Sequence, residues 1–277
     1  MSKTILITGT SSGIGHAAVR RFADAGWNVV ATLRNPSAAS DLAALPNVLV
    51  TRLDVQDETS IHAAIDAGMA RFGHIDALVN NAGFGQYGLF EATPDAKVRE
   101  QFEVNVFGVM AVTRAILPHF RRRHAGVIVN VSSGAGMFTL PLISLYCASK
   151  FALEGFSESL SYELASQGIA VKLVIPHGGV SSTRFGERSG AEHGEQGRMA
   201  DYDAFVAQTN AAFDSMRAGR MMTSDEVAQV IQQAVTDDTD RLRYLVGGDE
   251  RGFVRARREL TEQGYIEFMR GHFGDAA

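Results

Sequence analysis

The stretch that decides the fold is Thr4-Ile5-Leu6-Ile7-Thr8-Gly9-Thr10-Ser11-Ser12-Gly13-Ile14-Gly15, near the start of the chain. Its first five residues form a β-branched and apolar run that is typical of a buried strand, and helical periodicity begins at His16. A glycine turn between a strand and a helix presents free backbone N–H groups and the positive end of a helix dipole, and both attract an anion. The stretch therefore predicts a pyrophosphate-binding turn, although its Gly-x3-Gly-x-Gly spacing differs from the general Gly-x-Gly-x-x-Gly fingerprint.

Strand and helix patterns alternate from this stretch as far as residue 175. The later predicted strands span residues 28–34, 48–53, 75–80, 126–131, 169–175 and 241–246, and the main predicted helices span 58–72, 94–124 and 146–166. This alternation predicts an α/β fold: a doubly wound, Rossmann-type parallel sheet with helices on both faces. We expect residues 1–277 to form a single nucleotide-binding domain, with a substrate lid at about 181–222 and a short amphipathic tail at about 248–277.

The composition narrows the classes of partner. The chain has 45% hydrophobic residues and a net charge of −5, and that charge provides no basic field to attract nucleic acid or a membrane surface. The single cysteine, Cys147, cannot form an internal disulfide, and no Cys/His grouping has the spacing of a metal site. We find no secretory leader and no run of roughly 18 apolar residues, so we expect a soluble protein of the reducing cytoplasm without a metal.

Arg34 decides the expected cofactor. It ends the second predicted strand, roughly 20 residues beyond the glycine turn, where a dinucleotide fold meets the adenosine ribose. A guanidinium suits a ribose 2′-phosphate, whereas an acid would bind the free 2′-hydroxyl, and residues 27–35 contain no acid. The sequence thus favours NADP over NAD. The alternative is an exposed arginine at a strand end that binds no ligand.

The next two strands also end in candidate cofactor residues. Asp54-Val55 follows the third strand, and Asp54 is a candidate partner of the adenine amine. Alternatively Asp54 caps the next helix, a role for which Asp57 is the second candidate. Asn81-Ala82-Gly83 follows the fourth strand, and its small residues would let a cofactor lie flat.

Tyr146 and Lys150 are four residues apart at the start of a predicted helix, so they share one face of it. An ammonium beside the phenol should lower the tyrosine pKa and make Tyr146 a usable general acid or base. Taken alone, such a pair is more often an ordinary helix start. Ser133 precedes Tyr146 by thirteen residues, and no Gly-x-Ser-x-Gly elbow supports a serine-hydrolase role for it.

Two further features invite a functional interpretation. Asn105 lies on the apolar stripe of the predicted helix 94–124, where the alternative is an amide satisfied by neighbouring backbone. The linker 137–143 is too apolar for an ordinary exposed loop, so it either packs under another segment or lines an apolar pocket. Phe138, Leu140 and, from the lid, Phe185 are the candidate substrate contacts. Other bulky lid residues either close over the substrate or pack between helices, and these are Met199, Tyr202, Phe205, Met221 and Met222.

Together, Thr8-Gly9-x3-Gly13-x-Gly15, Asn80-Asn81-Ala82-Gly83, Asn105, Ser133 and Tyr146-x3-Lys150 resemble the short-chain dehydrogenase/reductase family over nearly the whole chain. The resemblance implies that Tyr146 is the general acid/base and that Ser133 hydrogen-bonds the reacting oxygen. It also implies that Lys150 holds the nicotinamide ribose and lowers the tyrosine pKa, and that Asn105 holds a water of a proton relay. The implied cofactor contacts are Gly9, Ser11, Ser12, Gly13, Ile14, Gly15, Arg34, Asp54, Val55, Asn81, Ala82, Gly83, Tyr146, Lys150, Pro176 and Gly178.

One motif departs from the family. Its sixth strand is usually followed by Pro-Gly, with a threonine five residues after the proline, but here His177 follows Pro176 and the threonine is Thr183. We interpret His177 as an insertion that leaves Gly178 in the glycine's place. The alternative is a contact with the nicotinamide amide or the substrate.

The resemblance implies an NADP-preferring oxidoreductase that interconverts a secondary alcohol and a ketone, or an aldehyde, with an apolar substrate favoured. The residues around Tyr146 look like the branch that contains hydroxysteroid- and retinol-type dehydrogenases. Family members usually assemble through the helices that bear Tyr146 and Asn105, which implies a homodimer or homotetramer. Two alternatives stay open: a non-catalytic NADP sensor, and an epimerase or dehydratase that retains its cofactor.

Overall fold

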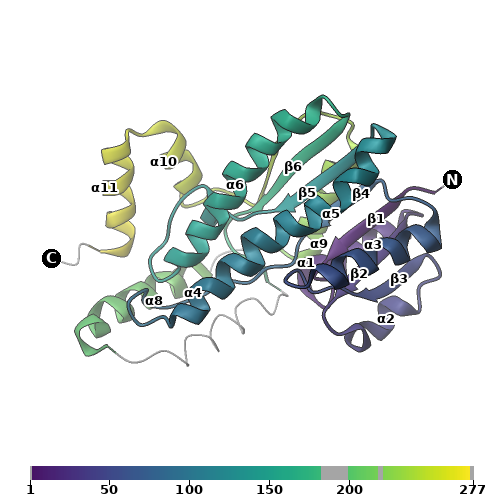
Figure 1. Cartoon of the computed structure of the whole chain (residues 1–277). Coiled ribbons are helices and arrows are strands. Elements are labelled where there is room, and N and C mark those ends of the chain that lie inside the picture. The colour runs from purple at the N-terminus through teal and green to yellow at the C-terminus, as the bar shows by residue number, and fades with distance from the viewer. Residues whose placement is uncertain (1, 182–198, 218–220, 275–277) are drawn as a thin grey trace.

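The computed structural model describes residues 2–181, 199–217 and 221–274, and its centre is a seven-stranded sheet (Figure 1). All six neighbouring strand pairs run parallel. In spatial order the strands are β3 (Val48–Arg52), β2 (Asn28–Leu33), β1 (Thr4–Thr8), β4 (Ala77–Asn80), β5 (Gly126–Val131), β6 (Ile169–Pro176) and β7 (Arg243–Val246). The predicted doubly wound parallel sheet is confirmed.

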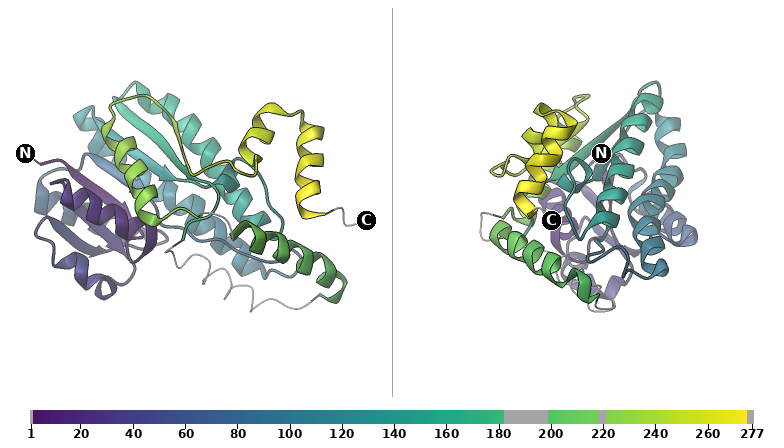
Figure 2. Two further views of the ribbon diagram at one scale, coloured as in Figure 1. Left: turned by 180° about the vertical axis from the view of Figure 1, so that it is seen from behind. Right: turned by 90° about the vertical axis from the view of Figure 1, so that its left-hand side faces the viewer.

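Helices cover both faces of the sheet (Figures 1 and 2). One face carries α1 (Gly13–Asp24) and α9 (Ser224–Thr236), which pack against each other, while α3 (Glu58–Phe72), α5 (Gly108–Arg123) and α6 (Ser144–Ala165) cover the other. The short helix α2 (Ser40–Ala43) precedes β3, and α4 (Asp95–Phe102) leads towards α5. Hydrogen bonds between Thr223 and Glu226 form a capping box at the start of α9.

Strand β1 shows why this arrangement is stable. Ile5 and Ile7 belong to the apolar core beneath α1 and α9, whereas Leu6 belongs to the core beneath α3, α5 and α6. Successive side chains of a strand point to opposite faces, and none of these three is exposed because both faces are covered. An uninterrupted apolar run is therefore what this strand requires.

Strand order reverses between β1 and β4, which places a crevice beyond their carboxyl ends. From β1 the sheet grows through β2 to β3 in one direction and through β4 to β7 in the other. Ligands of open α/β sheets bind outside such a switch point. The predicted cofactor site therefore lies at this edge.

The C-terminal third adds a third apolar cluster beside the sheet. It contains α8 (Asp203–Arg217), α10 (Phe253–Glu259) and α11 (Glu262–Phe273), packed with residues of the linker 137–142. Figures 1 and 2 show these helices at the end of the molecule away from the N-terminus. The weak periodicity of 181–222 did not predict α8, and the expected single tail segment is two helices.

Among the described helices, none is both long and apolar enough to span a membrane.

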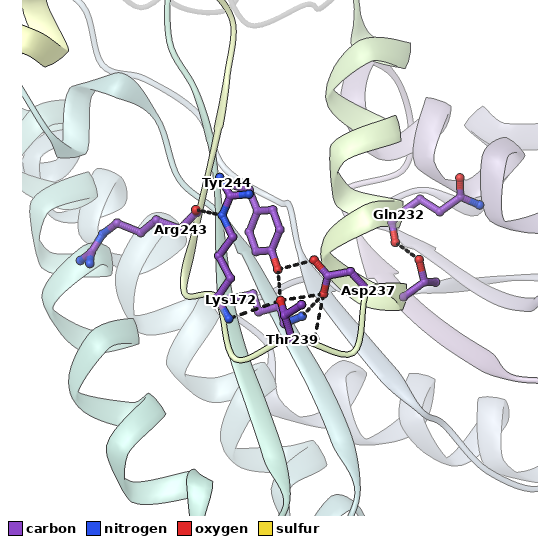
Figure 3. A network of polar contacts seen from close by, with 8 residues as sticks. Lys172, Gln232, Asp237, Thr239, Arg243 and Tyr244 are labelled. Carbon is purple, nitrogen blue, oxygen red and sulfur yellow. Dashed lines mark hydrogen bonds and ion pairs between the residues drawn. The ribbon is translucent and has the colours of Figure 1, made fainter.

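A polar network joins β6, β7 and the end of α9 (Figure 3). Lys172 is 2% exposed, and its Nζ lies 2.6 Å from Oδ1 of Asp237. The Tyr244 hydroxyl donates to Oδ2 of the same carboxylate at 2.7 Å, and the Thr239 backbone N–H donates to Oδ1 at 3.2 Å. Burial alone would raise the pKa of Asp237, but the hydrogen bonds from Lys172, Tyr244 and Thr239 outweigh it and hold that pKa well below its ordinary value.

Candidate active site

A cavity of about 790 Å³ opens at the carboxyl ends of the strands. Nearly all predicted cofactor residues line it, from the glycine turn through Arg34, Asp54 and Asn81 to Lys150. Ser133, Phe138 and Leu140 line it as well. Gly15 and Asn105 are not part of its wall, and Phe185 and Thr183 lie outside the described residues.

The glycine turn leads from β1 into α1 with a backbone that side chains would obstruct. Gly9 has φ +72°, and a Cβ there would lie 2.8 Å from the Ala82 Cα. A Cβ on Gly15 would lie 2.4 Å from the Gly9 carbonyl oxygen and 2.5 Å from Nδ2 of Asn81. Gly15 thus permits close packing of the turn rather than facing a ligand. The open turn at the start of a helix is what a pyrophosphate needs, so these residues fit a dinucleotide.

Asn81 and Thr8 brace this turn. The Asn81 side chain donates to the carbonyl oxygens of Thr8 and Gly9 at 2.9 and 3.0 Å. In return, Oγ1 of Thr8 accepts the backbone N–H groups of Asn81 and Ala82, each at 3.0 Å. Sequence reasoning missed this bracing role of Thr8, although its place at the end of β1 could have indicated it.

The end of the cavity next to β2 and β3, where the sequence predicts the adenosine ribose, is lined by Arg34 and Asp54. Arg34 follows β2, is exposed, and makes no ion pair or hydrogen bond within the described parts of the chain. Asp57 caps α3 by accepting the Ser60 N–H at 3.2 Å, so the capping alternative for Asp54 is excluded. Asp54 instead accepts the Gln56 N–H at 3.1 Å and lines the cavity.

The opposite part of the cavity brings Ser133, Tyr146 and Lys150 together. Ser133 ends the segment after β5 and accepts the Ala135 N–H at 3.2 Å, while its hydroxyl also hydrogen-bonds the Tyr146 phenol. One turn further along α6, Nζ of Lys150 donates to the Val131 carbonyl oxygen at 2.9 Å and lies 5.7 Å from the tyrosine ring centroid. The strand end and the helix start thus hold two hydroxyls and an ammonium at one wall.

Burial determines the direction in which the pKa values of Tyr146 and Lys150 shift. It raises the pKa of Tyr146 to about 12, against a smaller lowering by the hydrogen bond with Ser133. It also lowers the pKa of Lys150 to about 8, although the nearby Glu154 carboxylate opposes that shift. The expected lowering of the tyrosine pKa by Lys150 is therefore absent here, because desolvation of the phenol outweighs the influence of an ammonium that is directed at Val131.

Asn105 lies in a π-helical turn, Glu103–Phe107, that interrupts the predicted helix 94–124 between α4 and α5. Its Oδ1 accepts the Phe84 N–H at 3.0 Å, and its Nδ2 donates to the Phe84 carbonyl oxygen at 2.8 Å and to Oγ of Ser149 at 3.2 Å. The side chain is thus satisfied by neighbouring groups, as the alternative interpretation had it. It ties this turn to the start of α6, and its place in a water relay remains a prediction.

The apolar wall of the cavity rests on the C-terminal helices. Phe138 packs against Phe253 of α10 with ring centroids 5.2 Å apart, and the Thr139 N–H donates to the Tyr265 hydroxyl of α11 at 3.1 Å. The linker therefore lines the cavity and also packs under another segment, so both of the roles that the sequence left open apply to it. Sequence reasoning missed Phe253 and Tyr265, since no local pattern joins them to Phe138 and Thr139.

The bulky lid residues that the structure describes have different surroundings. Phe205 of α8 packs into the C-terminal apolar cluster, and Tyr202 donates from its hydroxyl to Oε2 of Glu91 at 3.0 Å. Met222 is buried in the core beneath α1 and α9 and forms a parallel bridge with Val180. Packing therefore accounts for Phe205 and Met222.

In the described ranges, no three His, Cys, Asp or Glu side chains gather where they could hold a metal ion.

Known proteins share this sequence pattern and this geometry. The family model described as short chain dehydrogenase matches residues 3–193. Human 17-beta-hydroxysteroid dehydrogenase type 1 is 36% identical over 99% of this chain and 88% of its own. A short-chain dehydrogenase/reductase from Burkholderia phymatum, solved with NAD, superimposes with a TM-score of 0.79 at 27% identity, over 93% of each chain. A gluconate 5-dehydrogenase from Burkholderia cenocepacia J2315, solved with NADP and tartrate, gives a TM-score of 0.72 at 27% identity, over 90% of this chain and 95% of its own.

Proposed function

The chain belongs to the short-chain dehydrogenase family, and we propose that it transfers a hydride between NADP(H) and a secondary alcohol or the matching ketone, or an aldehyde. The observation that carries this proposal is the meeting of Ser133, Tyr146 and Lys150 at the wall of the cavity that also contains the glycine turn. A nicotinamide dinucleotide would lie between the two groups of residues.

The chemistry follows from the positions of the two hydroxyls. A bound nicotinamide would supply or accept the hydride. Negative charge develops on the carbonyl oxygen during reduction, and the O–H groups of Ser133 and Tyr146 stabilise it from the cavity wall. Tyr146 then gives its proton to that oxygen and acts as general acid, or as general base in the reverse direction. Lys150 would bind the ribose hydroxyls of the nicotinamide half.

Arg34 supports NADP as the preferred cofactor, with NAD as the alternative. Its guanidinium is exposed at the adenosine end of the cavity and is not engaged by any described side chain, so it is available to a 2′-phosphate. We expect Arg34→Asp to weaken NADPH binding about tenfold or more, as loss of a charge-assisted hydrogen bond does, while NADH binding stays the same or improves.

Equilibrium titrations of both cofactors with wild type, Arg34→Asp and Arg122→Asp test this preference. Arg122 is exposed at the end of α5 and lies outside the cavity wall, so it controls for the general change in charge. Equal wild-type affinities for NADPH and NADH would refute the preference.

Phe138 and Leu140 support an apolar substrate, because they line the cavity close to Gly134 and Cys147, which follow Ser133 and Tyr146 in the chain. The predicted lid at about 181–222 lies partly outside the described residues, since residues 182–198 and 218–220 are not described. A panel of ketones, aldehydes and alcohols, assayed with both cofactors by nicotinamide absorbance, tests the reaction. Tight NADPH binding without turnover of any compound would favour the non-catalytic NADP sensor. Turnover of a substrate without release of oxidised or reduced cofactor would favour an epimerase or dehydratase that retains its cofactor.

We also propose a homodimer or homotetramer that uses the helices around Asn105 and Tyr146. Phe107, next to α5, is 53% exposed and Phe151 of α6 is 37% exposed, which leaves apolar surface for a second copy. Light scattering tests the assembly, and a monomeric mass would contradict it.

The lone Cys147 is buried, and we place the protein in the reducing cytoplasm.

A further inference from the structure

His177 follows Pro176 directly beyond the end of β6, and its imidazole has no counterpart in the Pro-Gly pattern of the family. The residue is only 5% exposed, yet it lines the cavity. Its backbone N–H donates to the Val246 carbonyl oxygen at 2.9 Å, whereas its ring makes no hydrogen bond to any residue that the structure describes. Because the ring nitrogens are not sealed off from the cavity, a molecule bound there can supply the missing partner.

The surroundings of His177 place it on the substrate side of the cavity. A Cβ on Gly134 would lie 2.8 Å from the Cβ of His177 and 2.8 Å from Cζ of Phe138. His177 and Phe138 therefore meet at the residue that directly follows Ser133. The charged groups that influence the imidazole, Asp249 and Arg258, both belong to the C-terminal segment that supports the apolar wall. Neither belongs to the glycine turn.

We propose that His177 is a substrate-positioning residue whose imidazole hydrogen-bonds a second oxygen of the substrate, close to the oxygen that Ser133 and Tyr146 bind. This inference rests on the proposed function and adds a substrate class: an apolar carbonyl compound or alcohol with a neighbouring hydroxyl or keto group. Phe138 and Leu140 would contact the carbon skeleton, while His177 would select the second oxygen.

The protonation state of the His177 ring determines which oxygen-containing groups of a substrate it can hydrogen-bond. Burial lowers the pKa of the ring, more than the Asp249 carboxylate raises it, and Arg258 adds to the lowering. The imidazole is therefore neutral at neutral pH, with one nitrogen that donates and one that accepts. A hydroxyl or a keto group can pair with such a ring, whereas a carboxylate would prefer a cation.

Pairs of ligands that differ only in the second oxygen test the proposal. Each pair contains a ketone and the 1,2- or 1,3-diketone of the same skeleton, and kcat/KM is measured with NADPH. We expect wild type to prefer the diketone about tenfold, as one net hydrogen bond allows. The preference should fall about tenfold in His177→Phe, which keeps a planar ring without nitrogens, to the value that the intrinsic reactivity of the diketone sets. It should return in part in His177→Asn, which keeps hydrogen-bonding groups.

A binding experiment gives an answer that does not depend on turnover. Mono-alcohols and the matching diols are titrated into the protein with NADPH bound, where no hydride transfer can occur, and nicotinamide fluorescence reports binding. A diol preference that requires His177 supports the positioning role even if no ketone is reduced, in which case only the proposed function fails.

Two results would overturn the role of His177. One is a diketone and diol preference that is the same in wild type and in His177→Phe, or missing from both. The other is a loss of NADPH affinity in His177→Phe and His177→Asn with unchanged melting temperatures, because the ring would then contact the nicotinamide.

Discussion

Tyr146 and Lys150 lose hydration when they pack at the start of α6, and this loss shifts their two pKa values in opposite directions. The phenol is held in its neutral acid form and the ammonium is brought closer to its neutral form. Each shift favours the state with less charge in the cavity wall. A nearby carboxylate, Glu154, is what keeps the ammonium from shifting further.

The first prediction concerns the titration of Tyr146 in the protein without cofactor. Its pKa of about 12 lies above that of a free tyrosine, so its proton should stay bound throughout the range from pH 7 to pH 10. The difference in tyrosinate absorbance between wild type and Tyr146→Phe should stay near zero over that range. One extra tyrosinate below pH 9 would show instead that Lys150 lowers the pKa of the phenol.

The second prediction separates the two roles of Lys150. Lys150→Ala should weaken NADPH binding about tenfold or more, since a charged hydrogen-bond donor is lost, and reduce kcat by about 100-fold or more. Lys97→Ala provides the control, because Lys97 lies on α4 outside the cavity wall. Near-normal turnover of Lys150→Ala would contradict the double role, and titration with NADPH measures the binding part.

At the scale of elements, the sequence predicted the parts that local periodicity defines. It indicated all seven strands, and the five inner strands are apolar runs because strands buried on both faces need no polar position. The edge strands β3 and β7 are only partly buried. The π-helical turn at Glu103–Phe107 escaped prediction, because it depends on distant contacts. The Asn105 amide bonds the backbone of Phe84, and a Cβ on Gly108 would lie 2.7 Å from Cγ2 of Val55. Phe84 and Val55 lie too far from Asn105 and Gly108 along the chain for a local sequence pattern to reveal these contacts.

The third prediction concerns the junction of β6, β7 and α9 (Figure 3). Asp237→Asn removes the anion that faces the buried ammonium of Lys172, and this should lower the free energy of unfolding at pH 7 by about 3 kcal/mol. Because the folded-state pKa of Asp237 is lowered, its stabilisation is complete above the unfolded pKa, about 3.9, and fades as the pH falls towards the folded value.

Urea unfolding of wild type and Asp237→Asn at pH 7 and at pH 3 measures both parts of this prediction. Their difference in unfolding free energy should be smaller at pH 3. Asp95→Asn is the matched control: Asp95 pairs with Arg99 at 3.0 Å, but both side chains are more than three-quarters exposed, so the change should stay below about 1 kcal/mol. A difference for Asp237→Asn as small as for the control would contradict the structural role of the network.

For the whole molecule, the cavity combines segments from all parts of the chain. The glycine turn comes from the first strand junction, Ser133 and Tyr146 come from the middle, and the apolar wall is supported by α10 and α11. Sequence reasoning could foresee the first two, because motif spacing and strand ends place them at one edge of the sheet. It could not foresee the wall, since Thr139 and Tyr265 are 126 residues apart and nothing in their local patterns pairs them.

The central claim is that this cavity performs hydride transfer with Tyr146 as its acid, and comparison of wild type with Tyr146→Phe tests it most directly. Both proteins are titrated with NADPH and then assayed against the carbonyl panel by the absorbance of NADPH. We predict nearly equal NADPH affinities and a loss of turnover of about 100-fold to 10,000-fold in Tyr146→Phe, the usual contribution of a positioned acid. Turnover by Tyr146→Phe at the wild-type rate, or no turnover by wild type despite tight NADPH binding, would contradict it.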